Sequence, residues 1–107
     1  MVISVFIPFA NEKKNIKEIV ERVEKARNQL APMSIELILV DDGSNDGSFE
    51  EASTCAHDKP WIKILRHRIN RGLTETMKTG FAACIGDIII FLPSDLESRP
   101  DEDIPRL

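Results

Sequence analysis

The sequence lacks any run of apolar residues that could cross a membrane. Its longest apolar run, Ile88–Leu92, falls far short of the roughly 20 residues that a transmembrane helix needs. The first residues, Met1–Pro8, contain neither a basic stretch nor a small-residue cleavage site, and they predict a first strand instead of a signal peptide. We therefore expect a cytoplasmic chain, with membrane association left open for a longer form of the protein.

Cysteine and histidine are scarce, and the basic residues form no cluster. Cys55 and Cys84 fit no CxxC or Cys/His spacing, so the sequence argues against zinc and predicts two buried, reduced thiols. His57 and His67 belong to no motif and are expected at the surface. The net charge is −4, and an acidic chain without a Lys/Arg cluster is a poor partner for nucleic acid.

Two signatures of other nucleotide or signalling proteins are also missing. Pro8–Asn11 stands where a dinucleotide-binding oxidoreductase would carry its G-x-G-x-x-G turn. A phospho-receiver domain would place its acidic pair after the first strand, whereas Asp41 and Asp42 follow the second predicted strand. Both classes are therefore disfavoured.

What the sequence does contain is a regular alternation of short β-branched runs and segments of helical periodicity. The chain of 107 residues is 42% hydrophobic, which suits one domain, residues 1–107, around one core. The predicted strands are Val2–Ile7, Ile35–Val40, Trp61–Leu65 and Ile88–Leu92. The predicted helices are Asn15–Leu30, a segment that begins near Asp46 or Ser48 on a Ser48/Glu51 capping box and ends before Lys59, and a segment after Gly72 that carries Leu73, Met77, Phe81 and Cys84. This order predicts an α/β fold, a Rossmann-like parallel sheet with helices on both faces.

Polar residues follow the last predicted strand, and the sequence stops at Ile104–Leu107, where a further helix could begin. We therefore expect the sheet to be incomplete at its C-terminus and to belong to a larger fold. A sheet edge left exposed in this way favours self-association, so a homo-oligomer is one expected state.

Polar side chains follow three of the four predicted strands. Pro8–Glu12 comes after the first strand, Asp41 and Asp42 after the second, and Pro93–Glu97 after the fourth. Because the carboxyl ends of parallel strands share one edge of a sheet, these residues should surround one cleft. So many carboxylates together favour a bound cation or a ligand rich in hydrogen-bond donors. The simpler alternatives are a polar turn after the second strand and a helix cap at Asp95.

Four segments, in this order and spacing, resemble family 2 glycosyltransferases of the dolichol- or polyprenyl-phosphate type: Ser4–Glu12, Val40–Ser44, Asn70–Gly72 and Gly86–Leu96. The resemblance covers nearly the whole chain. It implies the nucleotide-binding part of a GT-A fold, which takes a sugar from a UDP- or GDP-sugar and passes it to an acceptor such as a polyprenyl phosphate or a glycan. It also implies a divalent cofactor, Mg²⁺ or Mn²⁺.

The resemblance assigns residues position by position. It implies that Glu12 contacts the nucleoside and that Asp42 accepts a hydrogen bond from the base. Ala10 stands where the family usually has an aromatic residue, which implies that base stacking is either lost there or moved to Phe9. Pro93 replaces the first aspartate of the DXD metal motif, which leaves Asp95 and Glu97 as the metal ligands. The full set implied for nucleotide binding is Pro8, Phe9, Ala10, Glu12, Asp41, Asp42, Arg71 and Asp95.

No catalytic residue is assigned within this chain. In the family, the general base and the acceptor pocket come from sequence beyond the DXD strand, so the chain alone is expected to be inactive as an enzyme. The alternative is a non-catalytic nucleotide-binding or interaction module of glycosyltransferase origin.

Overall fold

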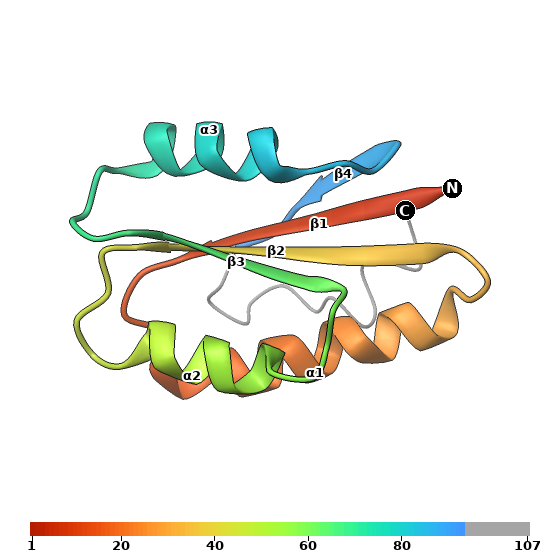
Figure 1. Ribbon diagram of the computed structural model, residues 1–107, viewed down its shortest axis with the longest axis horizontal. Helices are drawn as coiled ribbons and strands as arrows, with labels where there is room; N and C mark the ends of the chain where they lie inside the picture. The colour runs from red at the N-terminus through yellow and green to blue at the C-terminus, as the bar shows by residue number, and fades with distance from the viewer. Residues whose placement is uncertain (94–107) are drawn as a thin grey trace.

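The computed structural model describes residues 1–93. Four parallel strands form one sheet in the order β3-β2-β1-β4. The strands are β1 (Val2–Phe9), β2 (Ser34–Asp42), β3 (Ile62–His67) and β4 (Ile88–Phe91), and the helices are α1 (Lys13–Gln29), α2 (Ser48–Ala56) and α3 (Leu73–Ala83). Figure 1 shows α1 and α2 on one face of the sheet and α3 on the other. The predicted α/β architecture with both faces covered is confirmed.

The central strands are apolar along almost their whole length because helices cover them on both sides. Every residue of β2 after Ser34 is buried, and the same holds for most of β1. On α1, the buried residues recur at helical spacing and form one stripe that faces the sheet. The burial pattern therefore follows from the periodicity of the sequence.

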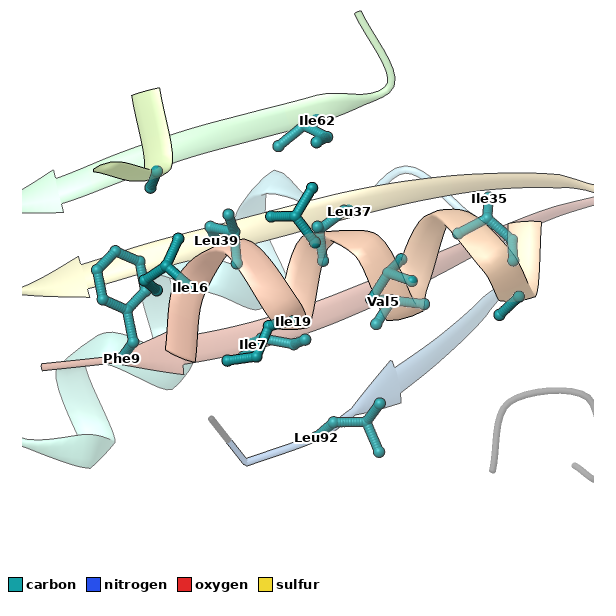
Figure 2. Packing of buried hydrophobic residues seen from close by; sticks show 14 of the residues in the cluster. Val5, Ile7, Phe9, Ile16, Ile19, Ile35, Leu37, Leu39, Ile62 and Leu92 are labelled. Atoms are coloured by element: carbon teal, nitrogen blue, oxygen red, sulfur yellow. The ribbon is translucent and has the colours of Figure 1, made fainter. Parts of the chain in front are cut away.

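The core is divided by the sheet into two parts. The larger part lies under α1 and α2, and Figure 2 shows Phe9 and Leu39 of the sheet beside Ile16 of α1. The smaller part lies under α3, where Phe6 contacts the ring of Phe81 edge-on at 5.5 Å. The second part is thin because α3 approaches β1 closely at Gly80.

Several predicted boundaries differ from the structure. Helix α1 begins at Lys13 instead of Asn15, and β3 runs to His67 instead of stopping at Leu65. The Ser48/Glu51 capping box was wrong, because Gly47 occupies the cap position of α2 and the Ser48 hydroxyl is bonded to Asp46 instead.

The two cysteines are only partly buried, although burial was predicted for both. Desolvation is the main reason that the pKa of each thiol is raised, which keeps both thiols protonated near neutral pH. Within residues 1–93, no helix combines the length and the hydrophobicity required to span a bilayer.

Candidate functional site

A pocket of about 310 Å³ opens at the carboxyl ends of β1 and β2, beside the start of α3. Its lining comes from three segments that are far apart in sequence: Pro8, Phe9, Ala10 and Glu12 after β1, Asp42 at the end of β2, and Asn70, Gly72, Leu73 and Thr76 around the start of α3. The strand order reverses next to β1, between β2 on one side and β4 on the other. Ligands of open α/β sheets bind at this kind of position.

The loops after β1 and β2 are held together by side-chain hydrogen bonds. The backbone amide of Asn11 donates to Ser44 Oγ at 2.9 Å, and the amide of Asn45 donates back to Asn11 Oδ1 at 3.0 Å. One step further along, the amide of Glu12 donates to Ser48 Oγ at 2.9 Å. The serines of the Asp41–Ser48 segment therefore fix the pocket rim that Glu12 belongs to.

Asp42 is the most heavily bonded side chain of the pocket. Its Oδ1 accepts the Arg71 amide at 2.9 Å and its Oδ2 accepts the Gly72 amide at 3.0 Å. Burial alone disfavours the charged form, but the hydrogen bonds from Arg71, His67 and Gly72 outweigh that effect and lower the pKa of the carboxyl. Asp42 is therefore a carboxylate at neutral pH, and it organises the segment that leads into α3.

His67 is the residue that the sequence analysis misplaced. It was expected at the surface as a residue without a partner, but its side chain is only 13% exposed. Its Nδ1 lies 3.1 Å from Asp42 Oδ1, and its Nε2 lies 2.8 Å from the Thr79 hydroxyl on α3. The sequence carries no signal for this contact, because it depends on the register that makes Asp42 and His67 direct partners on β2 and β3.

The start of α3 was also missed as part of the site. Gly72 adopts φ +86° at the cap position, a conformation that few residues other than glycine tolerate. The Thr76 hydroxyl donates to the Gly72 carbonyl at 2.9 Å, and its side chain is 1% exposed. The Asn70–Gly72 segment had been noticed, but no spacing in the sequence shows that it closes over Asp42.

Three of the residues implied for nucleotide binding are not arranged as expected. Asp41 is fully buried and does not line the pocket; its Oδ1 accepts the Ser44 amide at 2.9 Å, and Arg66 Nε lies 3.6 Å from its Oδ2, an ion-pair contact longer than a hydrogen bond. Arg71 reaches Asp42 only through its backbone, and its side chain is exposed outside the pocket lining. The Phe9 side chain is 3% exposed within the core, so it offers no free face for base stacking.

The metal ligands implied by the resemblance, Asp95 and Glu97, lie outside the described residues. Across residues 1–93, no three or more His, Cys, Asp or Glu side chains are grouped so that they could hold a metal ion. Glu12 Oε2, for its part, accepts a hydrogen bond from Asn15 Nδ2 at 2.8 Å.

Comparison with known proteins gives one consistent family. A family model described as glycosyl transferase family 2 matches residues 4–107. The undecaprenyl-phosphate 4-deoxy-4-formamido-L-arabinose transferase of Pseudomonas fluorescens is 40% identical over 108 residues, which cover 98% of this chain and 31% of the relative. The dolichol-phosphate mannosyltransferase of Pyrococcus furiosus is 34% identical over 107 residues, which cover 100% of this chain and 29% of the relative. The chain thus spans about a third of the length of these curated relatives.

A solved structure supports the fold. The mannosyltransferase PcManGT of Pyrobaculum calidifontis, in complex with GDP-Man and Mn²⁺, superposes with a TM-score of 0.75 at 21% identity, over 87% of this chain and 27% of that chain. The parallel sheet with helices on both faces is therefore the arrangement found in GT-A glycosyltransferases.

Proposed function

The chain belongs to glycosyl transferase family 2, and we propose that its pocket binds the nucleotide part of a UDP- or GDP-sugar, the donor in sugar transfer to a polyprenyl phosphate or a glycan. The observation that carries this proposal is the pocket at the carboxyl ends of β1 and β2, with Glu12 and Asp42 in its lining. Uracil and guanine both present N–H donors, and ionised carboxylates are acceptors only. A pocket of this composition favours a base over a bare phosphate.

The residues divide into two groups under this proposal. Pro8, Ala10, Glu12 and Asp42 border the nucleoside, while the Asn70–Leu73 segment closes the pocket from the side of α3. The negative charge of Glu12 and Asp42 repels a diphosphate, which places the phosphates away from both carboxylates. Arg71, exposed beside the pocket, is the cation of this segment available to the phosphates.

Asp95 and Glu97 are proposed to hold Mg²⁺ or Mn²⁺, because carboxylate oxygens are the ligands that these hard cations prefer. When bound, the ion neutralises negative charge on the departing nucleotide diphosphate. The Mn²⁺ in the Pyrobaculum structure and the names of the two relatives support the metal and a polyprenyl or dolichol phosphate acceptor. With such an acceptor, the chain would work from the cytoplasm at a membrane surface.

A thermal-unfolding panel tests the proposal. The 107-residue chain is heated with UDP, GDP, CDP or dTDP, each with and without Mn²⁺. A ligand at about 100 times its Kd stabilises the folded state by roughly 2.7 kcal/mol, so one nucleotide should raise the midpoint clearly. Glu12→Gln should reduce the rise, and Glu50→Gln, at an exposed position on α2, serves as the matched control. No rise with any nucleotide would contradict the proposed donor site.

A further inference from the structure

We propose that His67 is a positioning residue of the pocket, which fixes the Asp42 carboxylate in the orientation that faces the nucleotide. This inference rests on the proposed function of the pocket. His67 does not line the pocket itself, so any influence on a ligand must pass through Asp42. It is therefore not a ligand-binding residue in its own right.

The geometry uses both nitrogens of the imidazole. Asp42 Oδ1, as a carboxylate oxygen, only accepts hydrogen bonds, so Nδ1 of His67, 3.1 Å away, is the donor in that contact. Nε2 forms the second hydrogen bond of the ring, with the Thr79 hydroxyl at 2.8 Å. Hydrogen bonds between Asp42, His67 and Thr79 thus link the end of β2, the end of β3 and the middle of α3.

These side-chain hydrogen bonds restrict a motion of the Asp42 carboxylate that its bonds to backbone amides still allow. The amides of Arg71 and Gly72 each hold one oxygen of Asp42, but both lie on the 70–72 segment, which follows β3 as a loop. His67 belongs to a strand in register with Asp42 and is anchored to α3 at its far nitrogen. Of the donors to Asp42 named here, His67 is the one that lies on a strand, so it ties the carboxylate to the sheet, as a preorganised site requires.

The alternative is that His67 merely fastens α3 to the sheet. Both readings predict that His67→Leu lowers the melting temperature, so stability alone does not separate them. They differ in nucleotide affinity at a temperature where every variant is folded. They also differ in rescue, because the side-chain amide of asparagine begins at the same Cγ and can place its nitrogen where Nδ1 of histidine lies, without reaching Thr79.

The test is the Kd for the nucleotide that binds most tightly in the panel above, measured by calorimetry. His67→Leu should weaken binding about tenfold, in line with the loss of one hydrogen bond to a charged group, while His67→Asn should stay within about threefold of wild type. Thr79→Val, which keeps the shape but removes the hydroxyl, should fall between them. His57→Leu, at the other, exposed histidine, should leave the Kd unchanged.

A double mutant adds a measurement whose result would not depend on a purely structural role of His67. In an Asp42→Asn background, His67→Leu should cause little further loss, because both changes affect the same carboxylate. Wild-type affinity in His67→Leu, or a full additional loss on top of Asp42→Asn, would overturn the assignment. A wild-type chain that binds no nucleotide would instead overturn the proposed function, so the two failures are distinguishable.

Discussion

The carboxylate of Asp42 accepts hydrogen bonds from two backbone amides and from a ring nitrogen of His67. These three donors occupy most of the roughly four acceptor positions that a carboxylate offers. A base that bonds to Asp42 must therefore take the remaining position or share one with these donors. The 70–72 segment and a bound nucleotide are thus coupled through one side chain.

Asp42→Asn tests this role at the level of one residue. An amide nitrogen would face a donor from Arg71, Gly72 or His67, and a buried donor without an acceptor costs about 1–3 kcal/mol. We expect urea unfolding to show a loss of that order. Asp58→Asn, at an exposed position after α2, should be close to neutral. Equal stability of the two variants would contradict the assigned hydrogen bonds.

Glu36 should make stability depend on acidity. Burial disfavours its charge, but hydrogen bonds from the Ile85 amide and Ser4, together with Lys63 at 3.2 Å, lower its pKa overall. A carboxyl whose pKa is lower in the folded state stabilises the fold above its unfolded pKa, and this contribution is lost as the pH falls through the folded pKa.

The free energy of unfolding should therefore be level near neutral pH and decline below about pH 4. Glu36→Gln should be less stable than wild type at neutral pH and should decline less steeply in acid. Part of the decline in unfolding free energy should remain in that variant, because the pKa of Asp42 is also lowered. Parallel curves for the two proteins, measured by urea unfolding across the acid range, would refute the role of Glu36.

Helix α3 owes its close approach to the sheet to Gly80. A Cβ added there would lie 2.2 Å from Cζ of Phe6, well inside contact distance. Gly80→Ala should therefore destabilise the fold by about 1–3 kcal/mol, even though alanine is the better helix former. Thr74→Ala, at an exposed position of the same helix, is the control. A stabilised Gly80→Ala variant in thermal unfolding would show that α3 does not pack on Phe6 in this way.

Gly43 holds the loop after β2 against the segment that precedes α3. It has φ +78°, and an added Cβ would lie 2.4 Å from the Asn70 amide nitrogen. Gly43→Ala should push Asn70 out of the pocket wall, so both stability and nucleotide affinity should fall. Gly47→Ala isolates the effect of backbone strain from that of a steric clash. At Gly47 φ is +91°, but the atoms nearest to an added Cβ belong to the flexible end of Lys13 at 3.4 Å.

The outcome to measure is the difference between the two glycine variants. Both should lose stability through backbone strain, on the order of 1 kcal/mol. Only Gly43→Ala should also bind nucleotide less tightly in calorimetry. Equal affinities would mean that Asn70 does not shape the pocket.

The order of the elements could be predicted because it depends on local patterns. The buried stripe of α1 and the apolar runs of β1 and β2 are visible in the sequence, and the helices and strands were found in the right order. The boundaries and caps that were predicted wrongly depend on tertiary contacts. Helix α1 begins at Lys13 because the loops after β1 and β2 form hydrogen bonds to each other. Gly47 takes the cap position of α2, and the Ser48 hydroxyl that the capping pattern would use is bonded to Asp46.

The site could be predicted only in part, for the same reason. Pro8, Glu12 and Asp42 follow strands that were recognised, so their meeting at one edge could be expected. His67 could not, because the end of β3 was placed at Leu65 and its partner depends on the register with β2. Asp41 is the opposite case, a residue predicted for the site that does not line the pocket, because strand alternation turns its side chain away from that of Asp42 and into the fold.

At the level of the whole molecule, the sheet order β3-β2-β1-β4 brings polar residues from distant segments together around the pocket at the ends of β1 and β2. The family match covers residues 4–107, while the chain spans about a third of its curated relatives. What is proposed for this chain is donor binding at that pocket, whereas sugar transfer is an activity named for the longer relatives.

Amide NMR spectra of the ¹⁵N-labelled chain, titrated with UDP and GDP in the presence of Mg²⁺, test that claim most directly. The account predicts shifts at the amides of Phe9, Glu12, Asn70 and Gly72, which belong to pocket-lining residues. A second hollow between α1 and α2, lined by Lys17, Cys55 and Lys59 among others, should stay unchanged and serves as an internal control. Shifts confined to that hollow, or none with either nucleotide, would contradict a donor site at the ends of β1 and β2.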